Sequence, residues 1–562
     1  MKKYLFLLIL PIVALVSCNN ADKKESEMEK KFKEFAKTHE EQIAPLYAKL
    51  CDTYFKASIS GEESDYQQSA AYELEYTKIY TNKDDFEFMK KAKESGEVKD
   101  EILARELDVL YNEYLSNQDD PAMLEEMINM STEIDRQFSL FRANVNGQQM
   151  SDNQIEEILS TSTNSDEVKQ AWIEVKKLGP VVADDIVALV KKRNELAQSL
   201  GFNNYHEMSL KLSDQDPEEI SKVFDELDDL TRETYAGLKD EIDTYLAKKF
   251  NISKEELRPW HYQNRFFQEA PKMYEIDLDE YYKDQDIEQL TIDYYASIGM
   301  DITDMIANSD LYEKEKKNQH AYCIDVDKKG DIRVLCNIKP NYNWMNTMLH
   351  EFGHAVYNKY IDPELPFVLY DPAHTFTTEA IAMLFGRMGS NAQWMQDMLG
   401  ISDEEKEEIA ELGFQSLRLE QLVFSRWAQV MYRFEKALYE NPDQDLNKLW
   451  WDLVEEYQMV TRPEGRDMPD WATKSHIATS PCYYHNYLLG ELLASQLNYY
   501  ISTEIIGSDD YNMQSYYGNE EVGKFLIDKV FMPGAKWHWN TMIKNATGEE
   551  LTAKYYAMQF VQ

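Results

Sequence analysis

Glycine and proline are scarce in this chain of 562 residues, with 20 and 16 copies respectively. Together they reach about half of the roughly 12% that average usage gives, which is too few turn-forming residues for an all-β sandwich or propeller. Basic residues are also few, since 59 Lys and Arg stand against 102 Asp and Glu, for a net charge of −43. Because proteins that neutralise phosphates need clustered basic residues, we expect no nucleic-acid partner.

Charged residues make up 29% of the chain, which excludes a polytopic membrane protein. The length exceeds the roughly 250–300 residues at which single hydrophobic cores stop growing. We therefore expect one large acidic body built from two packed halves, or two domains.

The start of the chain differs in composition from the rest. Two lysines precede the apolar run Tyr4–Val16, which is too short to span a membrane comfortably. The run leads through Leu-Val-Ser into Cys18, which resembles the lipobox of bacterial lipoproteins, whose cysteine is lipidated and becomes the new N-terminus. An ordinary secretory signal with a chance cysteine is the alternative. The resemblance implies a lipid-anchored protein of the bacterial cell envelope, facing the periplasm or the cell surface.

The domain organisation follows from this start. We expect residues 1–17 to be a signal peptide and residues 18–35 a lipidated N-terminus with a flexible, polar tether. Residues 36–562 then form the main body. No internal repeat, low-complexity block or second linker interrupts it.

Helical patterns dominate the body. The clearest begins at Asp216, an N-cap residue followed by Pro217 and two glutamates. Apolar residues then recur at the spacing of one buried helical stripe, at Ile220, Val223, Phe224, Leu227, Leu230, Leu238, Ile242 and Tyr245. Similar periodicity runs through residues 40–115, 120–145, 152–200, 403–440 and 485–505. These patterns predict a mainly α-helical fold.

One segment favours β-structure instead. Residues 322–326 and 332–336 are β-leaning runs on either side of Lys329-Gly330, which is typical of a two-residue hairpin turn. A hairpin centred there places Cys323 opposite Cys336, so this register allows a cross-strand disulfide in an exported protein.

The strongest chemical signal lies just downstream, in a predicted helix over residues 345–360. His350 and His354 are four residues apart, so both project from one helical face and can bind the same zinc ion. Glu351 between them points to the same side and can take a proton from a zinc-bound water. Two histidines that line a helix without a metal are the structural alternative.

Catalytic zinc usually has three protein ligands and one open position. Glu379 lies 25 residues beyond His354, at the start of another apolar helical pattern. A carboxylate there would complete the set. By spacing alone, an acidic residue that the helix dipole favours in a first turn is an equally good interpretation.

Three stretches taken together resemble the peptidyl-dipeptidase A family, the angiotensin-converting-enzyme-like zinc peptidases. They are the HEFGH pentad, the TEAIA stretch that contains Glu379, and the segment WATKSHIATSPCYYHNY at residues 471–487. Looser similarity covers most of residues 40–560. The resemblance implies a large two-lobed helical fold around a deep central cleft, with a small β-hairpin at the active site. The related thimet oligopeptidase family shares HEFGH and the spacing to the glutamate, and is the near alternative.

The resemblance implies roles for the catalytic residues. Zinc would be bound by His350, His354 and Glu379, with Glu351 as the general base. His476 and a following tyrosine would stabilise the oxyanion. We assign Tyr487 to this role and Tyr484 to the substrate carboxylate, because their spacing fits one helical face. Tyr483 is the rival for the carboxylate.

Further residues would bind the substrate. The resemblance places His320 and Ala321 on a substrate-binding edge strand. It places Lys474 on the C-terminal carboxylate, with Gln263 as a weaker candidate. Because Lys474 lies two residues before His476, a short extended segment would present both towards one cleft. A solvated surface lysine is the alternative.

The sequence also departs from the family pattern. Met383 replaces an acidic residue four positions beyond the glutamate ligand, so a hydrogen bond to the ligands must come from elsewhere. Asn486 stands where the family has a chloride-binding arginine, whereas Arg462 matches another chloride ligand of the family. With one of the two ligands missing, the sequence gives little support for chloride activation. The family's disulfide is displaced as well, because its first cysteine aligns with Gln319.

These observations predict a zinc metallopeptidase over residues 36–562, with one zinc per chain and oligopeptides as substrates. We expect it to release C-terminal dipeptides. An oligoendopeptidase with the same zinc chemistry is one alternative. A non-catalytic lipoprotein that only binds peptides is another, although such a protein has no need of the general base Glu351.

Overall fold

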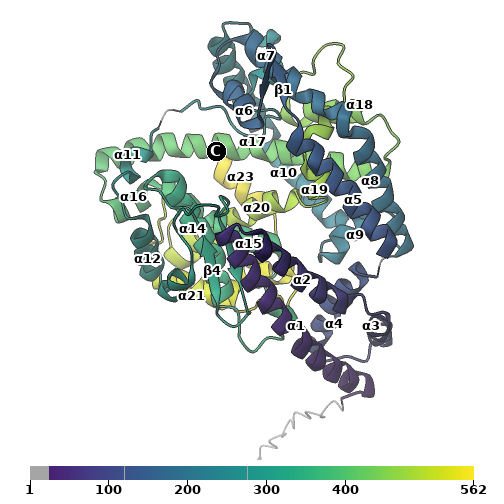
Figure 1. The fold of residues 1–562 in the computed structure, drawn as a ribbon. Coiled ribbons are helices and arrows are strands. Elements are labelled where there is room, and N and C mark those ends of the chain that lie inside the picture. Colours follow the sequence, from purple (N-terminus) through teal and green to yellow (C-terminus); the bar gives the residue numbers. More distant parts are fainter. Residues whose placement is uncertain (1–24, 119–120, 275, 562) are drawn as a thin grey trace, which may run out of the picture.

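The computed structural model describes residues 25–118, 121–274 and 276–561. Its regular structure is almost entirely helical, which confirms the predicted mainly α fold (Figure 1). The predicted signal peptide and the lipidation site Cys18 lie outside the described residues. Within those ranges, no helix is both long enough and apolar enough to cross a bilayer.

Four helices form the N-terminal part: α1 (Glu27–Ser60), α2 (Glu63–Tyr80), α3 (Lys83–Ser95) and α4 (Glu101–Ser116). Helix α1 begins at Glu27 because the Ser26 hydroxyl accepts the Glu29 N–H at 2.9 Å. Phe32 is fully buried in a small apolar core that α1 shares with α3 and α4. The predicted tether is therefore corrected, because residues 27–35 are an ordered part of the folded body.

The first half of the main body contains two short strands and six helices: α5 (Pro121–Leu140), β1 (Ala143–Val145), β2 (Gln148–Met150), α6 (Asp152–Thr161), α7 (Ser165–Val175), α8 (Gly179–Ser199), α9 (Tyr205–Leu212) and α10 (Pro217–Phe250). Helix α10 starts as predicted, with the Asp216 side chain accepting the N–H groups of Glu218 and Glu219. Six of the eight residues of its predicted stripe are buried, whereas Tyr245 is half-buried and Leu230 is 41% exposed.

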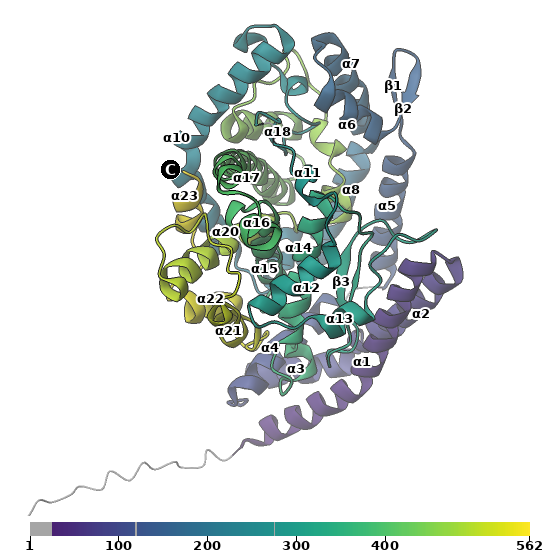
Figure 2. The same ribbon diagram turned by 90° about the vertical axis from the view of Figure 1, so that its left-hand side faces the viewer.

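The second half follows with α11 (Asp279–Tyr282), α12 (Ile287–Ser297), α13 (Thr303–Asn308), β3 (Tyr322–Asp325), β4 (Ile332–Leu335), α14 (Tyr342–Lys359), α15 (Thr375–Gly386), α16 (Ala392–Leu399), α17 (Asp403–Glu440), α18 (Leu446–Leu453), α19 (His476–Thr479), α20 (His485–Tyr500), α21 (Glu520–Leu526), α22 (Trp539–Thr547) and α23 (Lys554–Phe560). The long helix α17 crosses the molecule in Figure 1, and Figure 2 looks along its axis.

One apolar core joins both halves of the main body. It includes Met127 of α5, Trp172 of α7, Phe352 of α14, Trp427 of α17 and Phe560 of α23. The two halves that the sequence predicts therefore share a single core rather than having one each. The only separate core in the described ranges is the small one under α1, α3 and α4.

The predicted hairpin is present as β3 and β4, but its register differs. Cys323 pairs with Val334, not with Cys336, and both cysteines are free. The turn is longer than two residues because the Asp327 carboxylate accepts the N–H groups of Lys329 and Asp331, which closes a loop over residues 326–331. The predicted cross-strand pairing of the two cysteines is therefore wrong.

Candidate metal and peptidase site

Helix α14 positions the two histidines. It begins three residues earlier than predicted, because the Asn341 side chain accepts the Trp344 N–H at 2.9 Å. His350 and His354 lie one turn apart on the same face, with ring centroids 5.0 Å apart. The predicted helical spacing of the pair is confirmed.

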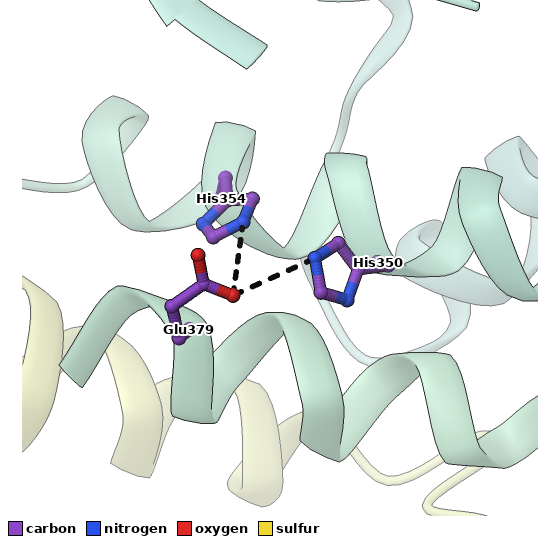
Figure 3. Close-up of side chains that lie close together, drawn as sticks. All are labelled: His350, His354 and Glu379. Atoms are coloured by element: carbon purple, nitrogen blue, oxygen red, sulfur yellow. Dashed lines mark ion pairs between the residues drawn. The ribbon is translucent and has the colours of Figure 1, made fainter. Parts of the chain in front are cut away.

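Helix α15 brings the third group to them. It packs closely on α14 at Gly353, where an added Cβ would lie 2.9 Å from the Ala382 Cα. This approach places the Glu379 Oε2 atom 3.8 Å from His350 Nε2 and 4.0 Å from His354 Nε2 (Figure 3). The structure thus brings together the three residues that the sequence selects as zinc ligands.

The three side chains fit a divalent metal ion. Their ligand atoms all lie within 4.8 Å of one another, and two imidazoles with one carboxylate form a donor set typical of catalytic zinc. Ligands at about 2.1 Å from a tetrahedral zinc lie roughly 3.4 Å apart. The 3.8 and 4.0 Å between the Glu379 oxygen and the two imidazoles are close to this separation. Burial lowers the pKa of His350 to about 4 and that of His354 to about 3, which keeps both imidazoles neutral and able to bind a cation.

A threonine orients one of the ligands. The Thr378 hydroxyl lies 2.7 Å from His354 Nδ1. With Nε2 on the metal, Nδ1 carries the proton and donates it to this oxygen. Thr378 therefore supplies to His354 a hydrogen bond of the kind that the family's acidic residue would make at the position of Met383. The sequence analysis missed this residue, although it directly precedes Glu379.

Glu351 is placed as a proton acceptor. Its side chain is 7% exposed, and its Oε2 atom has no hydrogen-bond donor among the described residues. Burial, and then the nearby charge of Glu379, raise the pKa of Glu351 to about 8, while a hydrogen bond from the backbone of Cys323 on β3 opposes them. A cation held by the three ligands would stabilise the ionised form, which is the form that accepts a proton.

Lys474 and His476 line one cavity of about 410 Å³, as the sequence predicts, but not from an extended segment. A 3₁₀ turn over Asp470–Thr473 ends at Lys474, and α19 begins at His476. His476 Nδ1 is buried and has no partner among the described residues. Burial first, and then Lys474, lower the pKa of His476 to about 4.

The three tyrosines lie close together, with the ring centroids of Tyr483 and Tyr484 at 5.3 and 5.4 Å from that of Tyr487. Tyr484 and Tyr487 line the cavity of Lys474, and the Tyr484 hydroxyl accepts the Trp427 Nε1–H at 2.8 Å. Burial, and then the charge of Glu379, raise the pKa of both Tyr483 and Tyr487. Of the three tyrosines, Tyr483 is the one that does not line the cavity of Lys474.

The amide that contacts Lys474 is Gln268. The Lys474 ammonium donates to the Gln268 Oε1 atom at 2.7 Å. Gln263 lines a neighbouring cavity of about 680 Å³, which shares Gln268 and Glu269 with the first. No sequence motif marks Gln268, because only the fold of this loop decides which of its glutamines faces the lysine.

The remaining predicted positions lie further out. His320 is exposed and Ala321 is half-buried, directly before β3. Asn486 is buried and accepts the Gln215 amide at 2.8 Å. Arg462 forms ion pairs with Asp452 and Glu455, so its charge is already neutralised by two carboxylates.

Comparisons with known proteins agree with this geometry. The sequence model of a family described as angiotensin-converting enzyme matches residues 26–561. Carboxypeptidase 1 of Bacillus subtilis (strain 168) is 24% identical over 249 residues, which cover 40% of this chain and 49% of that protein. The chain thus spans about half the length of the curated relative that it matches.

Proposed function

Since this chain belongs to the angiotensin-converting enzyme family, we propose that it is a zinc peptidase that removes dipeptides from the free C-termini of oligopeptides. The observation that carries the proposal is the group of His350, His354 and Glu379 beside the unpartnered carboxylate oxygen of Glu351. A binding protein has no use for such a buried base.

The roles that we propose for the other residues are those of a hydrolytic mechanism. A bound zinc ion would polarise the scissile carbonyl and lower the pKa of a water molecule towards ~7. Glu351 takes the proton of the attacking water and passes it to the leaving amine. Tyr487, whose raised pKa keeps its hydroxyl protonated, and a neutral His476 donate hydrogen bonds to the developing oxyanion, each worth roughly 3 kcal/mol.

Lys474 supports release from the C-terminus rather than internal cleavage. Its side chain is buried, and no carboxylate among the described residues lies within ion-pair distance of its ammonium group. A buried cation without an anion is suited to a carboxylate of the substrate. It shares its cavity with His476 and Tyr487, so a terminal carboxylate bound there lies near the reacting carbonyl.

Product identification tests this proposal. Mass spectrometry on a peptide mixture should detect released C-terminal dipeptides, and a chelator should abolish them. Glu351→Gln should retain about one zinc per chain and lose nearly all turnover, because the ligands remain and only the proton acceptor is lost. Products longer than dipeptides would favour the oligoendopeptidase, and full activity of Glu351→Gln would contradict the mechanism.

We also propose that a lipid on Cys18 anchors the protein to the bacterial cell envelope. The apolar run before this cysteine supports the proposal. Cys18→Ser should release the protein from the membrane fraction or block its maturation, because the lipidation site is removed. Unchanged fractionation and mass would contradict it.

A further inference from the structure

The cavity that contains Lys474 holds an excess of negative charge. Three carboxylates line it, from Glu269, Glu420 and Glu491, against the ammonium group of Lys474. Glu491 forms an ion pair with Arg387, which offsets part of its charge. When a terminal carboxylate of the substrate neutralises Lys474, the carboxylates of Glu269 and Glu420 remain uncompensated.

Glu420 is the carboxylate most available to a ligand. It projects from α17, its side chain is exposed, and it has no hydrogen bond or ion pair with any described residue. Desolvation, and then the charges of Glu491 and Glu269, raise the pKa of Glu420. A cation in the cavity would be attracted to Glu420 and would offset the repulsion among these carboxylates.

A second observation points to a ligand that donates hydrogen bonds. Gln421, next to Glu420 on α17, also lines the cavity and is only 6% exposed. Its Oε1 atom is buried and has no donor among the described residues. A buried acceptor without a donor is unfavourable, so a ligand that brings an N–H group to this wall of the cavity would be stabilised there.

The other walls suit an aliphatic stem. Phe424, Met383 and the ring of Tyr484 line the same cavity. Long basic side chains place their methylene groups on such surfaces and their charged ends on polar groups. A side chain that leaves the residue bound by Lys474 can therefore follow these apolar groups towards α17.

We propose that this cavity selects peptides whose C-terminal residue is arginine or lysine, with Lys474 binding the terminal carboxylate and Glu420 binding the side-chain cation. The inference rests on the proposed release of C-terminal dipeptides and names the substrates that this release favours. Glu269 adds to the negative potential, and Gln421 accepts a further N–H group.

The test compares two peptides that differ only at the C-terminal residue, which is arginine in one and citrulline, its neutral isostere, in the other. Wild-type enzyme should cleave the arginine peptide with a kcat/KM about tenfold higher, the typical value of one charged hydrogen bond. The ratio should fall with added salt. Glu420→Gln should bring the ratio close to one, and Glu420→Lys should instead favour a C-terminal glutamate.

Glu411→Gln is the matched control, because Glu411 is an exposed glutamate on the same helix that does not line this cavity. This variant should keep the wild-type ratio. Equal cleavage of both peptides to dipeptides by the wild type would overturn the inference and leave the proposed function intact. Fragments longer than dipeptides from both peptides would overturn the proposed function itself.

Discussion

The ammonium group of Lys474 should account for most of the preference for free C-termini. The residue is 8% exposed, and the one hydrogen-bond acceptor of its Nζ atom among the described residues is the neutral amide of Gln268, at 2.7 Å. Removing one partner of a buried, hydrogen-bonded charge pair costs about 2–5 kcal/mol. A value of about 3 kcal/mol corresponds to roughly a 150-fold loss of kcat/KM. Lys474→Met removes the charge and retains most of the volume.

The same lysine predicts a pH dependence. Burial first, and then Arg265, lower the pKa of Lys474 to about 8, while Glu156 and Glu269 oppose the shift. The charged form dominates below this pKa and is lost above it. For peptides with a free carboxylate, kcat/KM should therefore decline as the pH rises above about 8. Lys474→Arg should lack this decline, because a guanidinium stays charged throughout the range.

A double-mutant cycle with free and amidated versions of one peptide measures the pair directly. In the wild type, amidation should reduce kcat/KM by about two orders of magnitude. In Lys474→Met, the two peptides should be cleaved at similar rates, so that the two changes are far from additive. If amidation costs the same in both enzymes, another group binds the carboxylate and the assignment of Lys474 is refuted.

Three further predictions follow from contacts in the site. Gln268→Ala should raise KM for free-carboxylate peptides several-fold in steady-state kinetics, because Gln268 contacts Lys474. Gln263→Ala should leave KM unchanged, and the opposite order would contradict the observed geometry. Thr378→Val should weaken zinc binding about 10–100-fold in a competition titration with a chelator, because the acceptor of the His354 Nδ1 proton is lost. An unchanged zinc affinity would refute the role of Thr378 in orienting His354. Gly353→Ala should lower the free energy of unfolding by about 1–3 kcal/mol in denaturant titrations, because its Cβ would meet the Ala382 backbone at 2.9 Å. An unchanged midpoint would show that α14 and α15 can move apart.

The parts of the site that the sequence predicts are those set by local geometry. His350, Glu351 and His354 lie within one helix, so the helical repeat alone fixes their relative positions. Glu379 is different, because its distance from the histidines depends on how closely α15 packs on α14. Spacing left its role open, and only the resemblance to a family selected it. Gly353, inside the HEFGH pentad, permits that close packing.

The errors arise where tertiary contacts override a local pattern. The hairpin register depends on the Asp327 carboxylate, which holds a six-residue loop, and the Lys-Gly pair alone favours a shorter turn. The polar residues before position 36 suggest a tether, but Phe32 inserts into a core that α3 and α4 complete from more distant sequence. Neither α3 nor α4 can be placed against α1 from sequence periodicity.

The surroundings of Lys474 explain how a charge can be kept in such a buried place. Its ammonium group lies 5.5 Å from the ring centroid of Phe266, 5.3 Å from that of Trp427 and 5.2 Å from that of Tyr484. Aromatic faces attract a cation but do not neutralise it as a carboxylate would. Burial still lowers the pKa of this lysine to about 8, so the ammonium group keeps a strong tendency to bind an anion. A protein carboxylate at the same place would form a permanent ion pair with Lys474. Three rings and one neutral amide do not, so the ammonium group stays able to bind the C-terminal carboxylate of a peptide.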